Sequence, residues 1–481
     1  MNQASAFRVV IAGGGIAGLS AAFFLRDAPA TVTVLEGAPR LGGKLAVSDV
    51  AGIAIDEGAE ALLTKRPEGT SLIGELGLAG RLVMPGTMAT WIWSRGQMHP
   101  LPRRQFLGVP ADLDELARSG LLSAAGIARA RQDLELPATG RQADVPVAEH
   151  VGARFGREVV ERLVDPMLGG VYAGRPEDLS FEATLAPLAR ESRYHASLAE
   201  AAGRLLPPAR HPAPGTPPPG VFTTLTGGLG TLPAALVTAS GATVRTGAMV
   251  RELARTTSGW RLTVGSAHDP DYLDADAVVL AVPARPAARL LSGVPGATAA
   301  SVALGEIGYA SMAIVTLAYP GTAFPRPLDG SGYLVPAADG RPVKAVTFSS
   351  VKWPHLRDGT GTVIVRCSLG RIGEEQVLHA GDTELARIAA TELAAATGVR
   401  GAPADTRVSR WGGGLPQYTV GHLDRVASIR AAVAGQPGLA VCGAAYDGVG
   451  IPACIATAKQ AAGQITAYLL RERERPPVAR S

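Results

Sequence analysis

An apolar run, a glycine-rich turn and a second apolar run form the clearest pattern at the start of the chain. The sequence RVVIA at residues 8–12 predicts a short buried strand, and the glycines after it predict a tight turn into a helix. A second strand is expected at Val32–Leu35, and it ends at Glu36. Two strands joined through a glycine turn and a helix indicate the first βαβ unit of a dinucleotide-binding fold.

Each glycine of this turn has its own physical role. Gly13 allows the sharp turn after the strand, Gly15 lets a pyrophosphate approach the backbone, and Gly18 lets the helix pack against the strand. Glu36 stands where an acid accepts hydrogen bonds from a ribose 2′-hydroxyl, and its charge disfavours the 2′-phosphate of NADP. The plainer alternative is a glycine-rich turn in an ordinary α/β domain.

Helical spacing dominates the next part of the chain. Residues 91–206 are mostly helical in pattern, most clearly at 111–131 and 147–168. Proline is too dense at 207–220 for a helix or a central strand, so an exposed loop is expected there. The glycine-rich run at Gly227–Pro233 opens another helix. A second nucleotide motif is disfavoured at that point, because no apolar strand precedes it.

Strands and helices mix in the remaining sequence. The run at 277–282 is apolar on both faces and is expected to return to the main sheet. Residues 455–470 predict a closing helix, and the charged tail at 471–481 is expected to fray. The other expected elements are strands at 243–250, 260–264, within 306–370, at 407–411 and at 439–443, and helices at 284–304 and 381–397.

Composition narrows the class of protein. Of the 481 residues 47% are hydrophobic and 18% are charged, which indicates a globular chain of roughly two or three domains. The net charge is +4, without basic blocks interleaved with aromatics, so nucleic acid is not an expected partner. The N-terminus is too short and polar for a secretion signal, and no apolar run reaches the ~18 residues of a membrane span. A cytoplasmic location is therefore expected.

Cysteine and histidine spacing gives no sign of a metal or a disulfide. The chain has three cysteines, Cys367, Cys442 and Cys454, and none of them forms a Cys-x-x-Cys pair. We expect them to be reduced core residues. No arrangement of His, Cys, Asp and Glu has the spacing of a metal site, and no Ser/His/Asp or Cys/His arrangement indicates nucleophilic catalysis.

Three further segments exceed what a nicotinamide enzyme usually needs. Residues 40–44 (RLGGK) follow the second strand, and their two glycines let the backbone pass close to a flat ring or a phosphate. Residues 55–60 (IDEGAE) come next. Far downstream, residues 443–455 place a strand end, a small-residue turn and a helix N-terminus in succession. A helix dipole there would stabilise negative charge on a reduced flavin, so a flavin enzyme is indicated.

These motifs resemble those of the protoporphyrinogen/coproporphyrinogen oxidases, within the flavin amine-oxidase superfamily. The resemblance covers nearly the full length of the chain. The N-terminal fingerprint and residues 40–44 are shared across the superfamily, whereas residues 445–455 (AYDGVGIPACI) are far more specific. Other matching positions are 170–174 (GVYAG), Arg410–Trp411, 415–418 (LPQY) and Gly421–His422.

The resemblance implies an α/β fold, α+β overall, in which a Rossmann-like FAD-binding domain is interleaved with two other parts. One is a mixed-sheet substrate domain, and the other is a helical subdomain. The implied boundaries are 1–70, 221–283 and 405–470 for the FAD-binding domain, 71–90 and 284–404 for the substrate domain, 91–206 for the helical subdomain, 207–220 for the proline-rich loop and 471–481 for the frayed tail.

The resemblance also assigns contacts to a non-covalent FAD. The glycine turn would hold the pyrophosphate, Glu36 the ribose and Val250 the adenine, while Trp411 would close over the isoalloxazine. By pattern alone, Val250 is simply a strand residue and Trp411 is more often a core residue. The full implied set is Gly13, Gly14, Gly15, Ile16, Ala17, Gly18, Glu36, Gly37, Arg40, Gly43, Lys44, Gly58, Ala59, Glu60, Ala61, Val250, Trp411, Val449, Gly450 and Ile451.

The implied reaction oxidises coproporphyrinogen III to coproporphyrin III in haem biosynthesis. Six hydrogens would leave in three two-electron rounds, with hydride passing to flavin N5 and oxygen forming hydrogen peroxide, so no side chain is assigned as a catalytic acid or base. Animal and plant members carry an arginine for a substrate propionate where this chain has Glu60. Lys65 and Arg66 could replace it, and Tyr172 could line the cavity. A solvated loop pair and a structural tyrosine explain these residues equally well.

Other functions stay open at this point. Protoporphyrinogen IX is the nearest alternative substrate. Another flavin amine oxidase or desaturase is less favoured, because few aromatics are present to build an amine cage. A non-catalytic flavin- or tetrapyrrole-binding protein would keep the same nucleotide fold. The expected partners are the porphyrinogen and molecular oxygen. Peripheral contact with the inner face of the membrane and contact with a downstream haem-pathway enzyme are also open.

Overall fold

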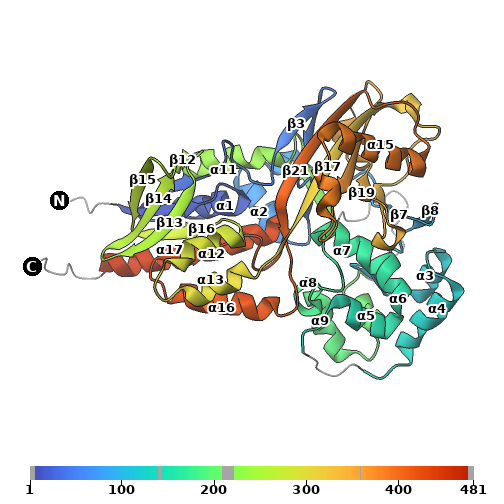
Figure 1. The fold of residues 1–481 in the computed structure, drawn as a ribbon, viewed down its shortest axis with the longest axis horizontal. Helices are drawn as coiled ribbons and strands as arrows, with labels where there is room; N and C mark the ends of the chain where they lie inside the picture. The colour runs from blue at the N-terminus through green and yellow to red at the C-terminus, as the bar shows by residue number, and fades with distance from the viewer. Residues whose placement is uncertain (1–5, 139–142, 208–220, 358, 475–481) are drawn as a thin grey trace, which may run out of the picture.

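The structure, a computed structural model, describes residues 6–138, 143–207, 221–357 and 359–474. Figure 1 shows two lobes, one built around a parallel sheet and the other around a mixed sheet that lies against a block of helices. The expected α/β class with a helical part is confirmed. The expected proline-rich loop at 207–220 lies outside the described residues except for Pro207.

The first βαβ unit forms where the sequence predicts it. β1 (Phe7–Ala12) and β2 (Ala30–Leu35) pair in parallel, and α1 (Ile16–Phe24) connects them. β1 pairs on its other side with β16 (Ala277–Leu280), which confirms that this apolar run returns to the main sheet. The order of the five-stranded parallel sheet is β12-β2-β1-β16-β22, with β12 at Thr243–Arg245 and β22 at Leu439–Val441.

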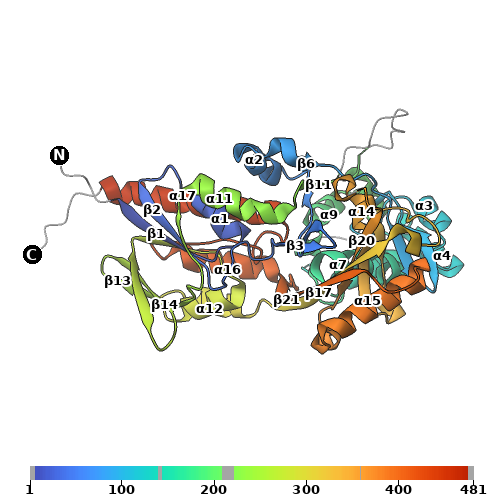
Figure 2. The same ribbon diagram turned by 90° about the horizontal axis from the view of Figure 1, so that it is seen from above.

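Two layers cover this sheet, because its strands are apolar on both faces. On one face α1 packs with α11 (Leu232–Ser240) and α17 (Ile451–Glu474). An antiparallel meander and three helices lie on the other face, where the Trp260 ring is fully buried. Figure 2 shows these layers on opposite sides of β1 and β2. The elements of the second layer are β13 (Val250–Thr256), β14 (Gly259–Gly265), β15 (Pro270–Ala275), α12 (Ala284–Ser292), α13 (Thr298–Gly305) and α16 (His422–Ala434).

The closing helix is longer than the sequence predicts. Instead of residues 455–470, α17 spans Ile451–Glu474. Pro452 fits its first turn, because the N–H that proline lacks would have no helical partner there. Fraying from residue 471 is therefore wrong for 471–474, where Arg and Glu are good helix formers. Residues 475–481 lie outside the described part of the chain.

The second lobe contains a seven-stranded mixed sheet. Its order is β21-β17-β20-β19-β18-β7-β8, and only the β18–β7 pair is parallel. Helix α15 (Asp382–Thr397) packs on one face through Leu385, Ala389 and Leu393. The strands are β21 (Asp405–Pro416), β17 (Tyr309–Pro320), β20 (Thr362–Leu369), β19 (Val343–Thr347), β18 (Gly332–Leu334), β7 (Trp91–Ser94) and β8 (Gln97–Pro100).

Sheet membership and packing depart from the expected boundaries in three places. β7 and β8 join the seven-stranded sheet, although 91–206 was expected to be helical; the aromatic and apolar run WIWS favours a strand. β21 is an edge strand of the same sheet rather than part of the FAD-binding unit. α12 and α13 pack against the parallel sheet's layer instead of the substrate sheet, because their apolar residues join the Trp260 core.

The helical block begins after residue 110 and consists of short helices. Glycine breaks the two long helices expected there: Gly120 (φ +67°) separates α3 from α4, and Gly156 (φ +87°) ends α5. A buried Arg154–Asp133 ion pair links these helices. The main helices are α3 (Leu113–Arg118), α4 (Ala124–Arg131), α5 (Val147–Phe155), α7 (Asp165–Tyr172), α8 (Phe181–Thr184), α9 (Ala186–Glu191) and α10 (Leu198–Arg204).

The three cysteines, Cys367, Cys442 and Cys454, are all free and buried, as the sequence predicts. Across the described ranges, no helix combines the length and the apolar character that crossing a membrane requires. The hydrophobic core is distributed over the two sheets and the helical block.

Candidate functional site

The glycine turn between β1 and α1 forms a bare backbone surface. Gly13 has φ +111°, and a Cβ there would lie 2.6 Å from the Ala281 oxygen. A Cβ on Gly18 would overlap the carbonyl oxygen of Gly13, so the helix can approach the strand only without one. A Cβ on Gly15 would meet only the Cα of Gly43, at 4.0 Å. Gly15 therefore leaves open space at the helix N-terminus, where backbone N–H groups lack helical partners.

Glu36 lies beside this turn. Its carboxylate accepts hydrogen bonds of 2.8 Å from the backbone N–H of Gly14 and of Ala38. These two donors fix the carboxylate at the carboxyl end of β2. The backbone of Glu36 also accepts from the N–H of Ala248 at 2.8 Å, and a Cβ on Gly37 would lie 2.7 Å from the Met249 side chain. Val250, which follows directly in β13, is thus near Glu36, as an adenine-side position requires.

The RLGGK segment folds back onto the glycine turn. The N–H of Gly42 donates to the oxygen of Gly14 at 2.8 Å, and Gly15 and Gly42 form an isolated parallel bridge. The Arg40 guanidinium donates to the Gly43 oxygen at 2.9 Å and so closes the loop. Residues 40–43 therefore form a second wall of the same cradle.

Lys44 stands at the end of this wall. Burial lowers the pKa of its amine, and Cys454 of α17 is close enough to act in the opposite direction. Within the described residues, the Lys44 amine has no hydrogen-bond or ion-pair partner. A half-buried cation without a partner requires a ligand group or water, because burying an uncompensated charge is costly.

Gly58 and Trp411 meet Lys44 from two other parts of the chain. A Cβ on Gly58 would overlap the oxygen of Lys44 and lie 3.0 Å from the Trp411 ring. The Trp411 indole N–H donates to the oxygen of Glu57 at 3.1 Å, and the N–H of Ala59 donates to the oxygen of Lys44 at 3.4 Å. The structure thus brings together 40–44, 57–59 and β21, as expected from their proposed common ligand.

The turn before α17 is held by Tyr418. Its hydroxyl donates to the oxygen of Ala444 at 2.6 Å and accepts from the N–H of Gly448 at 2.8 Å. Val449, Gly450 and Ile451 follow at the N-terminus of α17. Tyr172 lies next to Tyr418, with ring centroids 5.7 Å apart. Burial raises the pKa of Tyr172 to about 12, so its hydroxyl stays protonated at neutral pH.

Glu60 is the centre of a buried ion-pair network. Its carboxylate accepts from the Lys352 amine at 2.7 Å and from the Arg366 guanidinium. Burial alone would raise the pKa of Glu60, but the two cations lower it to about 2. The Glu60 side chain is therefore already neutralised by protein groups. Lys65 and Arg66 are exposed at the start of α2 (Pro67–Glu75), and Arg66 lies 3.4 Å from Glu68.

Sequence reasoning missed Lys352 and Arg366. A signal was present for Arg366, because it interrupts the otherwise apolar strand TVIVRCSL of β20, and a buried arginine requires an anionic partner. Nothing local indicates that this partner is Glu60, 306 residues away. Lys352 gives no comparable signal. The role of Tyr418 was also missed, although its motif had been noticed.

The residues of the cradle fit the pyrophosphate and ring of an FAD. The open backbone at Gly15, the unpaired N–H groups at the start of α1 and the unpartnered Lys44 amine are complementary to an anionic dinucleotide. Bound there, the cofactor would meet groups from the N-terminal, central and C-terminal parts of the chain. These individual contacts remain predictions.

Comparison with known proteins identifies the family. The profile described as "Flavin containing amine oxidoreductase" matches residues 16–466. Coproporphyrinogen III oxidase of Mycobacterium tuberculosis is 40% identical over 94% of this chain and 95% of its own length, and that of Bacillus subtilis is 32% identical over 96% and 98%. A solved Exiguobacterium structure, named as a protoporphyrinogen oxidase, superposes with a TM-score of 0.84 at 30% identity, over 96% of this chain and 99% of that one. The chain therefore belongs to the flavin-containing amine oxidoreductases and is an oxidoreductase with a flavin cofactor.

Proposed function

We propose that this protein is an FAD-dependent coproporphyrinogen III oxidase. It would convert coproporphyrinogen III to coproporphyrin III in haem biosynthesis, removing six hydrogens in three two-electron rounds, with oxygen as the acceptor and hydrogen peroxide as the by-product. Two relatives that carry this enzyme name share 32% and 40% identity with nearly the whole chain. The cofactor, held without a covalent bond, supplies the hydride acceptor when bound.

The observation that carries this proposal is the convergence of distant segments on one cradle. The glycine turn, the RLGGK segment, Gly58 and Trp411 are in contact, although Gly58 and Trp411 are more than 350 residues apart in sequence. Such a cradle orients a planar ring and excludes water, which is what the protein contributes in a cofactor enzyme. The chain needs no dedicated acid or base for this role.

Different residues would bind the cofactor and the substrate. Glu36 and the N-terminus of α1 would bind the ribose and the pyrophosphate, and Lys44 would place a positive charge beside the flavin. Tyr172 of α7, which lies beside Tyr418, would line the substrate cavity. Lys65 and Arg66, which are both exposed, would bind propionates at the rim, because the carboxylate at Glu60 cannot pair with another carboxylate.

Anaerobic mixing tests this function directly. The FAD-loaded protein would be mixed with coproporphyrinogen III, and loss of the oxidised flavin absorbance would be followed first, with porphyrin formation followed after oxygen is admitted. We expect the flavin to be reduced without oxygen, because it takes two of the six electrons. After oxygen is admitted we expect porphyrin, with one hydrogen peroxide formed per two-electron round. Faster turnover of protoporphyrinogen IX would assign the neighbouring reaction instead. Unchanged flavin absorbance with both porphyrinogens would exclude an oxidase of this class.

A further inference from the structure

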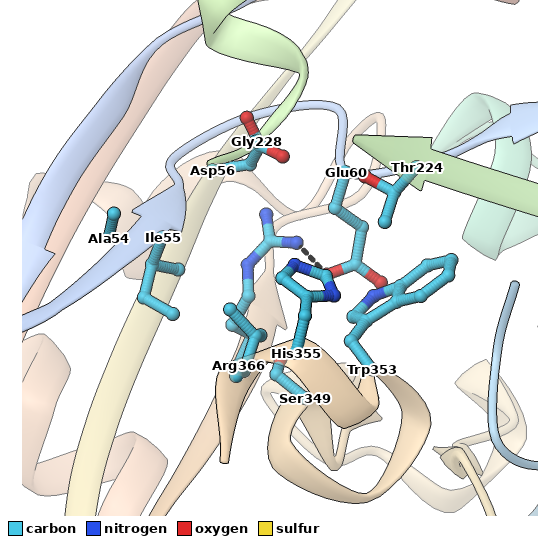
Figure 3. A pocket seen from close by; sticks show the side chains of 11 residues that line it. Ala54, Ile55, Asp56, Glu60, Thr224, Gly228, Ser349, Trp353, His355 and Arg366 are labelled. Atoms are coloured by element: carbon cyan, nitrogen blue, oxygen red, sulfur yellow. Dashed lines mark hydrogen bonds and ion pairs between the residues drawn. The ribbon is translucent and has the colours of Figure 1, made fainter. Parts of the chain in front are cut away.

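A small cavity lies beside Glu60, directly behind the proposed flavin-lining segment at 58–61. It measures about 20 Å³ and is bounded by residues of β4 (Ile53–Asp56), β11 (Phe222–Leu225), α14 (Ser349–Lys352) and β20. Figure 3 shows Arg366 and His355 rising toward Glu60 and Asp56 across this space. A buried water needs roughly 10–15 Å³ and a few polar partners. The cavity is therefore large enough for one water and too small for an organic ligand.

Four side-chain polar atoms at this cavity have no hydrogen-bond partner. They are Ser349 Oγ, Trp353 Nε1, His355 Nδ1 and Arg366 Nε, and all four are buried. Ser349, Trp353 and Arg366 are 0%, 1% and 7% exposed, so solvent cannot satisfy them from outside. Buried polar atoms are rarely left unpaired, and four around one space indicate a shared partner inside it. Trp353 Nε1 and Arg366 Nε can only donate, so this partner must accept two hydrogen bonds, while Ser349 Oγ and His355 Nδ1 can each accept one from it.

The charges around the cavity favour a neutral acceptor. Arg366 and Lys352 carry two positive charges, and Glu60 pairs with both. Asp56 adds a second carboxyl, which accepts from the backbone N–H of Leu229 at 3.0 Å and of Gly230 at 2.9 Å. The cations are thus balanced by carboxyl groups, and no excess positive charge is left to hold a chloride ion. Water satisfies the donors without adding charge.

The ion pairs of Glu60 with Arg366 and Lys352 also hold the proposed flavin-lining segment in place. The Arg366 guanidinium donates to the Gly58 oxygen at 2.6 Å and to the Glu60 carboxylate. Lys352 donates to the other carboxylate oxygen of Glu60 at 2.7 Å. Arg366 belongs to the mixed sheet, whereas Gly58 contacts Lys44 and Trp411 at the cradle. The position of the segment is therefore set by the second lobe through these two cations.

We propose that one buried water, bound by Ser349, Trp353, His355 and Arg366, completes a positioning site that holds residues 58–61 against the flavin. The water supplies the acceptor for Arg366 Nε, and the guanidinium is thereby fixed in the orientation that reaches both Gly58 and Glu60. Arg366 and Lys352 are positioning residues, because they act on the flavin through this segment. The inference rests on the proposed flavin site.

The water is tested by a high-resolution crystal structure of the FAD-bound protein. We expect one density peak within about 2.7–3.2 Å of Arg366 Nε and Trp353 Nε1. Crystals soaked in bromide should show no anomalous peak there. The water site would be overturned by an empty cavity, by a bromide peak, or by side chains that hydrogen-bond to one another instead of to a water. A second crystal structure, of the protein without FAD, reports on the same cavity, so failure of the proposed function would not hide the result.

The positioning role is tested by FAD affinity and by the flavin reduction potential. S349V fills the cavity with a methyl group and is expected to shift the reduction potential and to raise the FAD dissociation constant about tenfold, the effect of losing one hydrogen bond to a charged group. R366M should show a larger shift, and R366K should recover part of it, because lysine still reaches Glu60. R387M, which removes an exposed ion pair with Glu384 on α15, is the control.

The two proposals fail in different ways. If S349V and R366M keep the natural FAD affinity and reduction potential, the positioning role is wrong while the flavin function stands. If S349V does not fold, R366K against R387M still decides, since R366K keeps the charge and should weaken FAD binding only if the Gly58 contact matters. If the natural protein takes up no FAD, the proposed function fails, and the water is judged by the crystal structure alone.

Discussion

Three glycines in the first turn differ in what a methyl group would meet. At Gly18 a methyl group would overlap the Gly13 oxygen. At Gly13 it would be strained, because the backbone has a φ of +111°, which residues with a side chain rarely adopt. At Gly15 the backbone has φ −78°, which suits any residue, and the space is open. The first two glycines are thus required by the fold, whereas Gly15 is required only if something else occupies that space.

Gly15→Ala separates binding from folding. We expect the free energy of unfolding of the apoprotein to change by less than about 0.5 kcal/mol, since no contact is disturbed. FAD affinity should fall by at least about tenfold, because the methyl group blocks the path of the pyrophosphate. Quenching of flavin fluorescence measures the affinity, and urea unfolding measures the stability. Gly18→Ala is the matched comparison and should destabilise the apoprotein itself. Natural affinity in Gly15→Ala would refute the assigned pyrophosphate position.

Asp56 should make stability depend on pH. Burial raises the pKa of its carboxyl to about 6 in spite of the N–H groups of Gly230 and Leu229, from 3.8 in the ordinary state. The folded protein then binds the proton more tightly than the unfolded chain. The contribution of Asp56 to stability is full below pH 4 and is lost as the pH rises to about 6, by an amount on the order of 3 kcal/mol.

Asp56→Asn removes this dependence. Urea unfolding should be measured at intervals from pH 4 to pH 7. Between pH 4 and 6 the free energy of unfolding of the variant should rise relative to that of the natural protein, and above pH 6 the difference between the two should be constant. Asp27→Asn, on a side chain that is 87% exposed, is the control and should leave the natural pH profile unchanged. A difference between Asp56→Asn and the natural protein that stays constant from pH 4 to 6 would contradict the buried, protonatable carboxyl.

At the scale of elements, the start of α17 depends on a single hydroxyl. Tyr418 lies just after β21 and bonds both Ala444 and Gly448, so it joins the mixed sheet to the turn that precedes the helix. Its ring also stacks on His422 with centroids 3.7 Å apart. The position of Val449–Ile451 relative to the cradle is set through this tyrosine.

Tyr418→Phe keeps the ring and removes both hydrogen bonds. We expect a loss of about 1–3 kcal/mol in the free energy of unfolding, because the Gly448 N–H and the Ala444 oxygen are left without a partner. FAD should also dissociate faster, as measured by stopped-flow transfer to an excess of a flavin-binding apoprotein. Tyr272→Phe, at a side chain that is 61% exposed, should change neither quantity. Equal behaviour of the two variants would show that the hydroxyl is not needed.

The helical block has its own anchor in Asp133. This buried carboxylate pairs with Arg154 of α5 and accepts from Ser197 and from the N–H groups of Leu198 and Ala199 at the start of α10. Asp133 is 0% exposed, so bulk solvent does not reach the carboxylate. Removal of one partner would therefore leave an uncompensated charge in the core.

Asp133→Ala should destabilise the protein by about 3–5 kcal/mol, the range for breaking a buried ion pair. Asp114→Ala is the matched control, because Asp114 pairs with Arg131 at 2.6 Å on the surface of the same block, and such exposed pairs contribute at most about 1 kcal/mol. Thermal and urea unfolding measure both variants. Similar losses in the two would mean that Asp133 is not the anchor of the block.

How far the sequence predicts each element depends on how local its determinants are. The β1–α1–β2 unit was predictable, because its glycines, its apolar runs and Glu36 all act within 30 residues. The place of β7 in the seven-stranded sheet was not, because its parallel partner β18 lies some 240 residues away. The start of α17 was placed four residues late, since a proline in the sequence does not reveal whether it sits in a first turn.

At the scale of the whole molecule, the chain passes repeatedly between its two lobes. The parallel sheet takes strands from residues 7–35, 243–280 and 439–441, and the mixed sheet takes strands from 91–100 and 309–416. Contacts at the cradle therefore close long loops, which no local pattern can specify. The fold class was predictable from motifs and resemblance, but the Glu60–Arg366–Lys352 network required three-dimensional structure, because Glu60 lies 292 residues from Lys352 and 306 from Arg366.

The central claim is that these crossings bring distant segments together around one flavin that accepts hydride from a porphyrinogen. Anaerobic stopped-flow mixing of the FAD-loaded protein with coproporphyrinogen III tests it most directly. We predict loss of the oxidised flavin spectrum on mixing, since one flavin takes the first two of the six electrons. Porphyrin should appear once oxygen is admitted and reoxidises the flavin for the remaining rounds. Protein that takes up no FAD, or bound flavin that stays oxidised while the porphyrinogen is intact, would contradict the account.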